Sequence, residues 1–419
     1  MNRHLLLIGA FILGVLALGV LLYVMFFRGS IVTNTNSQQN QNVNGTFPDL
    51  NGNVNRGSNT NGVLPTINGS NANRSGVATN TAPAAIAGGG DTNVDTLVSG
   101  NASDIVVDAS GNVRYYDKAT GQFYKLDANG TVVPLSGVKF PEAEAVVWSG
   151  QKNEVIVSFP DDSKVYYNFD TKKQATLPKE GEDFSFAPAG GQIAFKFNAK
   201  NANDRFLVVS NPDGTSITPV EPLGENGNKV DVQWSPNNQV VATYAPGLDG
   251  GTQEVFFVGK NGENFKSTVT DGRGFEGSWS PDGQRMLYST YSAGSSYNPS
   301  LHIVDAQGDS VGGNNRPLDI ATWSDKCTFS KAGTTLYCAV PDAGTLPSGS
   351  GIYRNQAASA PDSFYVVDLT TGAKSLLANP VGTDGSRRFS AVNMTLSPDE
   401  KTLYFTDAPT GRVLTLKLR

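Results

Sequence analysis

The sequence predicts an all-β protein, a β-propeller of four-stranded antiparallel blades, preceded by one N-terminal transmembrane helix and a disordered linker. Three observations lead to this prediction. A short phrase with an aromatic residue, a turn and an alternating apolar run recurs along most of the chain. An uncharged apolar run stands near the start, and a long stretch rich in Asn, Gly, Ser and Thr lies between the two.

The first element is the uncharged apolar run of 23 residues at positions 5–27. A helix of this length spans about 34 Å, enough for the hydrocarbon core of a bilayer. The run is longer than the apolar core of a cleaved signal peptide, and no convincing small-x-small cleavage site follows it. We interpret it as an uncleaved signal anchor with residues 1–4 as a short cytoplasmic tail; a cleaved signal peptide is the alternative.

The second element is the stretch 28–93, which contains few large apolar side chains. Such a composition cannot offset the entropy lost on ordering the chain. We therefore interpret residues 28–93 as a disordered tether, and the propeller as residues 94–419.

The repeated phrase is clearest in 277–290, GSWSPDGQRMLYST, and a degenerate first copy starts at Ile105. The residue just before the turn is, in the six clear copies, Trp148, Phe186, Trp234, Trp279, Phe329 and Leu396. These positions are 38, 48, 45, 50 and 67 residues apart, which is the period of propeller blades with insertions that lengthen toward the end.

Each copy has the properties of a β-hairpin. An apolar strand ends on a large residue, Ser-Pro opens a turn, Asp-Gly closes it because glycine tolerates positive φ, and a second alternating strand follows. Two further strand patterns follow most copies, so each unit has four strands that must pack radially against neighbours. Residues 94–99 are expected to supply the missing outer strand of the last blade and so to close the ring. This count gives seven blades, or six if the Ile105 unit is not a full blade.

The repeated phrase resembles the WD40-like (PD40) repeat of the TolB-type β-propellers. Trp279, Ser280, Pro281, Asp282 and Gly283 match that repeat fully, and the resemblance covers roughly 94–419. It implies the propeller fold and says little about function, because these residues form the turn and pack between blades. The extra amino-terminal domain of TolB is not found here, so the partners of TolB do not transfer.

The two cysteines, Cys327 and Cys338, stand on either side of the turn in the sixth hairpin. Facing positions of antiparallel strands are close enough for a disulfide, and a compartment outside the cytoplasm would allow one. We predict a disulfide; two buried free thiols are the alternative.

Several classes of function are disfavoured by composition. The net charge of −6 comes without a basic stripe, so no nucleic acid is expected. Only two histidines exist, and His302 lies in a strand pattern, so no metal, no cofactor and no catalytic residues are assigned and the chain is predicted not to be an enzyme. A glycosidase-like carboxylate pair near the central channel is harder to dismiss, and the candidates for it are Asp249, Glu254, Asp342, Asp362 and Asp384.

The long loops of the repeat all belong to one predicted face of the propeller. These are the connections between the second and third strands of a blade and between one blade and the next, and the longest is 341–362. Tyr and Arg are enriched at binding hot spots. The candidate partner-binding residues on these loops are therefore Tyr291, Tyr297, Tyr353, Arg354, Arg273, Phe275, Arg387 and Arg388.

The function predicted from sequence is that of a single-pass membrane protein, anchored through 5–27, that displays its propeller outside the cytoplasm as a non-catalytic protein-binding or assembly module. A protein of the cell envelope on the long-loop face is the expected partner. The alternative is a carbohydrate- or cell-wall-binding propeller, with or without glycosidase-like hydrolysis.

Overall fold

The computed structural model describes residues 82–127, 130–342, 344 and 360–419, all within a compact unit that spans Val77–Arg419. The predicted membrane segment 5–27 and most of the predicted linker lie outside the described residues. Among the residues that are described, no helix combines the length and the apolar character needed to cross a bilayer.

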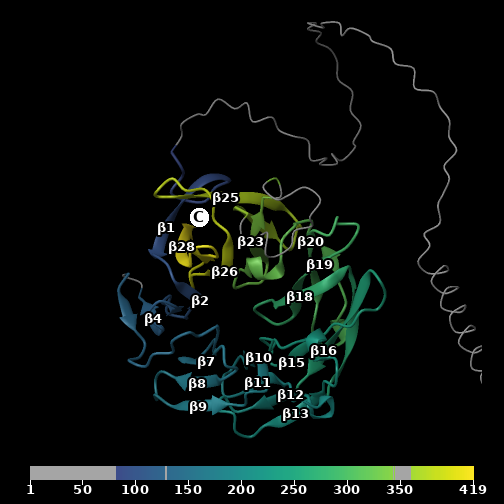
Figure 1. Cartoon of the computed structure of the whole chain (residues 1–419). Coiled ribbons are helices and arrows are strands. Elements are labelled where there is room, and N and C mark those ends of the chain that lie inside the picture. Colours follow the sequence, from purple (N-terminus) through teal and green to yellow (C-terminus); the bar gives the residue numbers. More distant parts are fainter. Residues whose placement is uncertain (1–81, 128–129, 343, 345–359) are drawn as a thin grey trace, which may run out of the picture. The chain divides into compact units, whose positions relative to one another are not determined.

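The regular secondary structure of the described chain is almost entirely β-strand, as predicted (Figure 1). Five sheets have four antiparallel strands each. Their strands are β2 (Ala102–Val107), β3 (Val113–Asp117), β4 (Gln122–Leu126), β5 (Val132–Pro134); β6 (Ala145–Trp148), β7 (Glu154–Ser158), β8 (Lys164–Asn168), β9 (Gln174–Leu177); β10 (Gly181–Phe186), β11 (Ile193–Phe197), β12 (Phe206–Ser210), β13 (Thr218–Pro222); β14 (Val230–Asp231), β15 (Val240–Tyr244), β16 (Thr252–Gly259), β17 (Asn264–Asp271); and β18 (Arg273–Trp279), β19 (Arg285–Tyr291), β20 (Pro299–Asp305), β21 (Arg316–Pro317).

The sixth sheet has eight strands, in the order β22-β23-β24-β25-β1-β28-β27-β26. Its strands are β22 (Cys327–Phe329), β23 (Thr335–Pro341), β24 (Asp362–Asp368), β25 (Lys374–Gly382), β1 (Gly90–Val98), β28 (Arg412–Lys417), β27 (Thr402–Asp407) and β26 (Ala391–Leu396). The helices of the described residues are short 3₁₀ turns, η1 (Ala202–Asp204), η2 (Gly227–Lys229), η3 (Gly308–Ser310) and η4 (Ser324–Lys326).

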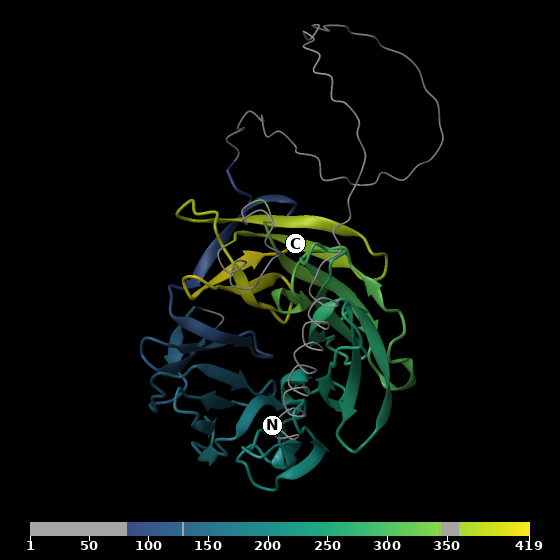
Figure 2. The same cartoon turned by 45° about the vertical axis from the view of Figure 1, so that its right-hand side comes forward.

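Strand β1 joins the two ends of the described chain. Val94–Val98 pairs antiparallel with β28, which is the closing strand expected from the sequence. The sequence analysis did not predict that β1 also begins earlier, at Gly90, and that Gly90–Val94 pairs in parallel with β25. Both neighbours of β1 therefore have their edges covered, and Figure 2 shows β1 between them.

The inner strands contact one another around the ring. β2 contacts both β26 and β6, β6 contacts β10, and β22 contacts β26. Hydrogen bonds cross these contacts: the Trp148 indole donates to the Asp104 carbonyl (2.6 Å), and the Trp279 indole donates to the Gln233 carbonyl (3.2 Å). In these two copies the tryptophan of the repeated phrase therefore ties its sheet to the preceding one, whereas the Trp234 indole donates to Asn238 in its own turn.

The core consists of separate apolar clusters between successive sheets. Phe123 in β4 packs edge-on against Trp148 and Phe169 of the next sheet, with ring centroids 5.3 and 5.2 Å apart. Leu287 in β19 belongs to the same buried cluster as Leu336 in β23. Each sheet buries both faces in this way, which a lone four-stranded sheet cannot do.

The Ser-Pro-Asp-Gly phrase closes the first turn of each unit through its serine. In four copies the serine hydroxyl accepts a backbone N–H five residues later: Ser235 from Val240 (2.9 Å), Ser280 from Arg285 (2.9 Å), Ser330 from Thr335 (3.0 Å) and Ser397 from Thr402 (3.0 Å). Gly283 has φ 65°, and a Cβ there would lie 2.7 Å from the Asn237 nitrogen. Glycine is needed at this position because other residues rarely adopt this positive φ and because a Cβ would clash with Asn237.

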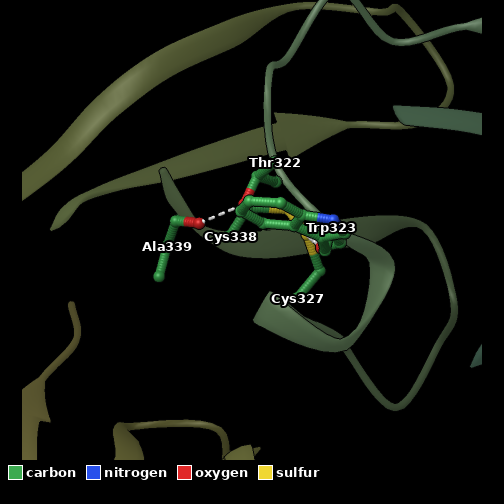
Figure 3. Close-up of a disulfide and its surroundings, with 5 residues drawn as sticks. All are labelled: Thr322, Trp323, Cys327, Cys338 and Ala339. Atoms are coloured by element: carbon green, nitrogen blue, oxygen red, sulfur yellow. Dashed lines mark hydrogen bonds between the residues drawn. A yellow bond between two sulfur atoms is a disulfide. The ribbon is translucent and has the colours of Figure 1, made fainter. Parts of the chain in front are cut away.

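The disulfide between Cys327 and Cys338 is present in the structure (Figure 3). The two residues are directly paired across β22 and β23, as their spacing around the turn suggested. Trp323 and Thr322 lie beside the bridge, and the Thr322 hydroxyl donates to the Ala339 carbonyl (2.6 Å). The bridge thus links β22, the shorter of the two inner strands of the eight-stranded sheet, to β23.

Replacing Val94 with alanine tests the closing role of β1. Val94 is 1% exposed in the cluster shared by β25 and β28, so the variant is expected to lower the free energy of unfolding by about 2 kcal/mol in chemical denaturation. Val132→Ala in β5 is the matched control, because that valine is 47% exposed, and its expected change is within about 0.5 kcal/mol. Equal effects of the two substitutions would contradict a closing role.

Replacing both cysteines with alanine tests the contribution of the disulfide. The bridge closes a short loop of the unfolded chain, so its loss is expected to lower the free energy of unfolding by about 2–3 kcal/mol. A reductant should lower the melting temperature of the wild type and leave that of the double variant unchanged. A wild type that is insensitive to reduction during unfolding would show that the bridge adds no stability.

Candidate functional site

The predicted partner-binding residues fall into separate regions. Tyr353 and Arg354 lie outside the described residues. Tyr297 lies in the loop 292–298, as expected from the sequence, whereas Tyr291, expected on the same loop, is the last residue of strand β19. Arg387 and Arg388 lie in the connection between β25 and β26.

The segment 270–276, predicted to be a loop, is mostly strand. β17 ends at Asp271 and β18 begins at Arg273, so Gly272 alone connects the two sheets. Gly272 has φ 110°, and a Cβ there would lie 2.8 Å from the Tyr291 carbonyl oxygen, so this direct connection depends on glycine. Arg273 and Phe275 are therefore strand residues, and the prediction that they lie on a loop was wrong.

Arg273 and Tyr291 face each other across β18 and β19. Arg273 donates to the Asp249 carbonyl (3.1 Å) and so ties the loop 245–251 to β18. The Tyr291 ring covers Gly274, where a Cβ would lie 2.1 Å from ring carbon Cε1. Arg273 and Tyr291, together with the exposed Leu248 next to Asp249 and the exposed Tyr297 in the loop 292–298, are the residues that we call the loop patch.

The loop patch exposes much apolar surface. Leu248 is 55%, Tyr291 47% and Tyr297 59% exposed, whereas most large apolar residues of the described chain are buried. Large exposed aromatic residues grouped on neighbouring loops are typical of binding surfaces. The loop patch is thus the part of the predicted site that the structure brings together.

Phe275, Arg387 and Arg388 do not belong to the loop patch. Phe275 is half-buried, and its ring packs against buried Tyr288 at 5.5 Å. Arg387 forms an exposed ion pair with Asp91 of β1 (2.6 Å), and Arg388 is the next residue in the chain. Phe275 therefore supports the sheet, and Arg387 lies beside the closing strand β1.

The acidic residues proposed as a carboxylate pair are engaged locally. Asp249 and Asp384 are exposed and accept backbone N–H groups of their own turns, as does Asp342. Glu254 accepts the Ser267 hydroxyl. Asp362 is buried and pairs with Lys326 at 2.8 Å, so it does not present a carboxylate to solvent.

A different set of acids, missed in the sequence analysis, marks the inner strands. Asp104, Asp183, Asp231 and Glu276 each stand three residues before the last residue of the inner-strand motif, a position that Lys326 takes in the β22 unit. The shared offset is visible when the copies are aligned on the last residue of the inner-strand motif. At this offset Asp183 connects neighbouring sheets, because its carboxylate accepts the Val232 backbone N–H (2.8 Å).

The inner-strand acids differ in how their charge is compensated. Asp183 pairs with Lys196 at 3.2 Å. Asp231 is less well compensated: burial, and then repulsion from Asp183, raise its pKa to about 6, against the opposing effects of Lys196 and Gln233. Burial also raises the pKa of Asp104 and of Asp325.

The described residues contain no group of three or more His, Cys, Asp or Glu side chains arranged to hold a metal ion. His302 is buried and stacks on Tyr288, with ring centroids 5.0 Å apart. Burial lowers the pKa of His302, which favours a neutral, packed imidazole.

Comparisons with known proteins show the propeller fold. No protein-family model matches this chain, and no curated protein matches it in sequence. The β-propeller domain of Cps50 (Swd1) from Myceliophteria thermophila is similar over 77% of this chain and 98% of its own, at 11% identity and a TM-score of 0.51. An oligogalacturonate lyase from Vibrio parahaemolyticus is similar over 74% of this chain and 88% of its own, at 11% identity and a TM-score of 0.49. Prolyl endopeptidases are similar over 76% of this chain and 50% of theirs, at 12% identity and a TM-score of 0.48.

The prediction that the chain is not an enzyme is contradicted by these comparisons. The similar structures are mostly enzymes, including the oligogalacturonate lyases and the prolyl endopeptidases. At such low identity the likeness shows the fold alone and assigns no reaction to this chain.

Asp231→Asn tests the electrostatic cost at the inner strands. The pKa of Asp231 is raised from 3.8 in the unfolded chain to about 6 in the native protein, so between these pH values the native state binds more protons than the unfolded state. The contribution of this carboxyl group to stability is therefore full below about pH 4 and is lost as the pH rises through 6. Relative to the wild type, the variant is expected to gain roughly 1–3 kcal/mol in the free energy of unfolding at pH 7.5 and little at pH 4. The exposed Asp204→Asn is the control; a pH-independent difference for Asp231→Asn would contradict the raised pKa.

Proposed function

We propose that this chain is a membrane-anchored propeller that works outside the cytoplasm and binds a protein of the cell envelope through the loop patch. The observation that carries the proposal is the exposure of Leu248, Tyr291 and Tyr297, in a region where Arg273 ties the loop 245–251 to β18 and pairs with Tyr291 across β18 and β19. The fold-level resemblance to TolB-type repeats is consistent with it.

The proposed propeller has seven blades. The eight-stranded sheet then counts as two blades, β22-β23-β24-β25 and β26-β27-β28-β1, which share an edge because β1 pairs on both sides. Support comes from the core, in which each successive pair of four-stranded sets in the described chain has its own apolar cluster.

The loop patch has the chemistry of a protein-binding surface. Tyrosine supplies a large apolar area with a polar tip, at a low entropy cost for a side chain of its size. Tyr291 is held over Gly274, so its ring is positioned before a partner arrives. Such preorganisation lowers the cost of ordering the site on binding.

The proposed location rests on two independent features. The apolar run at 5–27 is long enough to anchor the chain in a bilayer. The disulfide is typical of proteins in oxidising compartments and is rare in the cytoplasm. An anchored propeller on a long tether could reach partners away from the membrane surface.

A triple substitution of the loop patch tests the proposal. The full-length chain is used as bait on an envelope extract, beside a variant with Leu248→Ser, Tyr291→Ser and Tyr297→Asn; asparagine is chosen because position 297 has φ 59°. A retained protein is then purified, and its affinity for both chains is measured. The patch variant is expected to bind at least about 30-fold more weakly, as loss of a hot spot of about 2 kcal/mol implies.

The matched control carries Val132→Ser, Val133→Ser and Ile217→Ser, three residues of similar exposure away from the loop patch. It should bind like the wild type. Equal affinity of the patch variant and the wild type for every retained protein would refute the proposal. Retention of wall glycan in place of protein would favour the alternative of carbohydrate recognition.

A further inference from the structure

A polar pocket lies where the first and last inner strands meet. Its volume is ≈ 440 Å³, within the range of small-molecule sites. It is bordered by the starts of β2 and β26, the end of β27, the turn 408–411, and two single residues, Lys118 and Glu144. None of the residues of the loop patch lines it.

Two β-bulges aim side chains at this pocket. The pairing register shifts between Ser103 and Val106 in β2 and between Val392 and Thr395 in β26. At each shift a non-glycine residue has a left-handed backbone, Asp104 with φ 51° and Asn393 with φ 52°, and both residues line the pocket. Bulges at such positions redirect side chains and are frequent beside functional sites.

A third bulge, in β10, shows the structural use of this device. There the carboxylate of Asp183, whose φ is 57°, accepts a hydrogen bond from the Val232 backbone N–H of the next sheet. In the part of the chain that the structure describes, no such cross-sheet hydrogen bond is made by the side chains of Asp104 and Asn393. The Asp104 carboxylate interacts with Ser103 of its own strand and is attracted by Lys118, and the Asn393 side chain is exposed, so both line the pocket without being committed to a neighbouring sheet.

The floor of the pocket holds a buried hydroxyl without a hydrogen-bond partner. Thr406 is 4% exposed and lines the pocket, and within the described residues its Oγ1 atom has no partner. Leaving a buried hydroxyl unpaired costs about 1–3 kcal/mol, so such an atom next to a pocket points to a group that satisfies it.

The charges of the lining select the class of ligand. Asp104 and Glu144 carry carboxylates, and Lys118 carries an ammonium group that attracts Asp104. The two carboxylates disfavour an anionic ligand, and the ammonium group disfavours a compact cation. The side chains of Asn101, Asn393 and Thr410 add hydrogen-bond donors and acceptors to the lining. We infer that this pocket binds a neutral polyhydroxylated ligand, a single sugar ring or a short saccharide, whose hydroxyls reach Asp104, Asn393 and Thr406.

Sugars that share one ring and differ in charge test the inference. The full-length chain, in buffer and detergent without sugar, is titrated with glucose, galactose, mannose and N-acetylglucosamine, and with the charged analogues glucosamine and glucuronate, by ligand-observed NMR and calorimetry. At least one neutral sugar is expected to bind more tightly than both charged analogues.

Two near-isosteric variants assign the binding to the pocket. Asp104→Asn keeps the left-handed backbone and removes the charge, and Thr406→Val removes the hydroxyl; each is expected to weaken binding about tenfold. Asp162→Asn is the matched control, because Asp162 has φ 62° but an 86% exposed side chain outside the pocket.

Three results would overturn the inference. The first is that none of the neutral sugars binds at concentrations up to about 20 mM. The second is that a charged analogue binds as tightly as the best neutral sugar. The third is that both pocket variants bind the sugar as the wild type does. The loop-patch triple variant should bind the sugar normally, so failure here and failure of the partner proposal are separate outcomes.

Discussion

The double pairing of β1 is the constraint on which the rest of the structure depends. Each sheet buries its faces only against its neighbours, so every interface requires that the ring close. Closure joins Val94–Val98 to β28 and Gly90–Val94 to β25, bringing the first described strand to the last ones. Contacts between residues so distant in sequence are slow to form, so the sheets between them must be correctly ordered before closure can stabilise them.

The repeat made most of the fold predictable because its signals are local. Turn chemistry and alternation place the inner hairpins, and the facing positions of Cys327 and Cys338 follow from the same turn. The parallel pairing of β1 with β25 left no local signal, because it depends on where two distant strands meet. The segment 270–276 misled for a related reason: its glycines suggest a loop, whereas Gly272 makes a one-residue connection and Gly274 a bulge under Tyr291.

The candidate site was predictable only in part, since exposure depends on neighbours. Tyr297 could be placed from loop lengths, but the contact of Arg273 with the Asp249 carbonyl requires the fold. From the sequence Asp362 is expected to be a loop acid, whereas in the structure it is buried against Lys326 of η4. The inner-strand acids could have been found by aligning the copies. The sequence does not show that Lys196 pairs with Asp183, or that the pKa of Asp231 is raised by burial and by the nearby Asp183.

The polar pocket and the loop patch differ in their relation to closure. The loop patch is formed by two sheets that are adjacent in sequence, so a partner there reads a local surface. The pocket is formed by β2 on one side and β26 and β27 on the other, which come together only in the closed ring. A ligand that bridges Asp104 and Asn393 therefore binds the closed state alone and stabilises it in proportion to the logarithm of ligand concentration over Kd. Occupancy of the pocket would thus be linked to the stability of the whole propeller, whereas a partner on the loop patch would chiefly stabilise the two sheets that carry it.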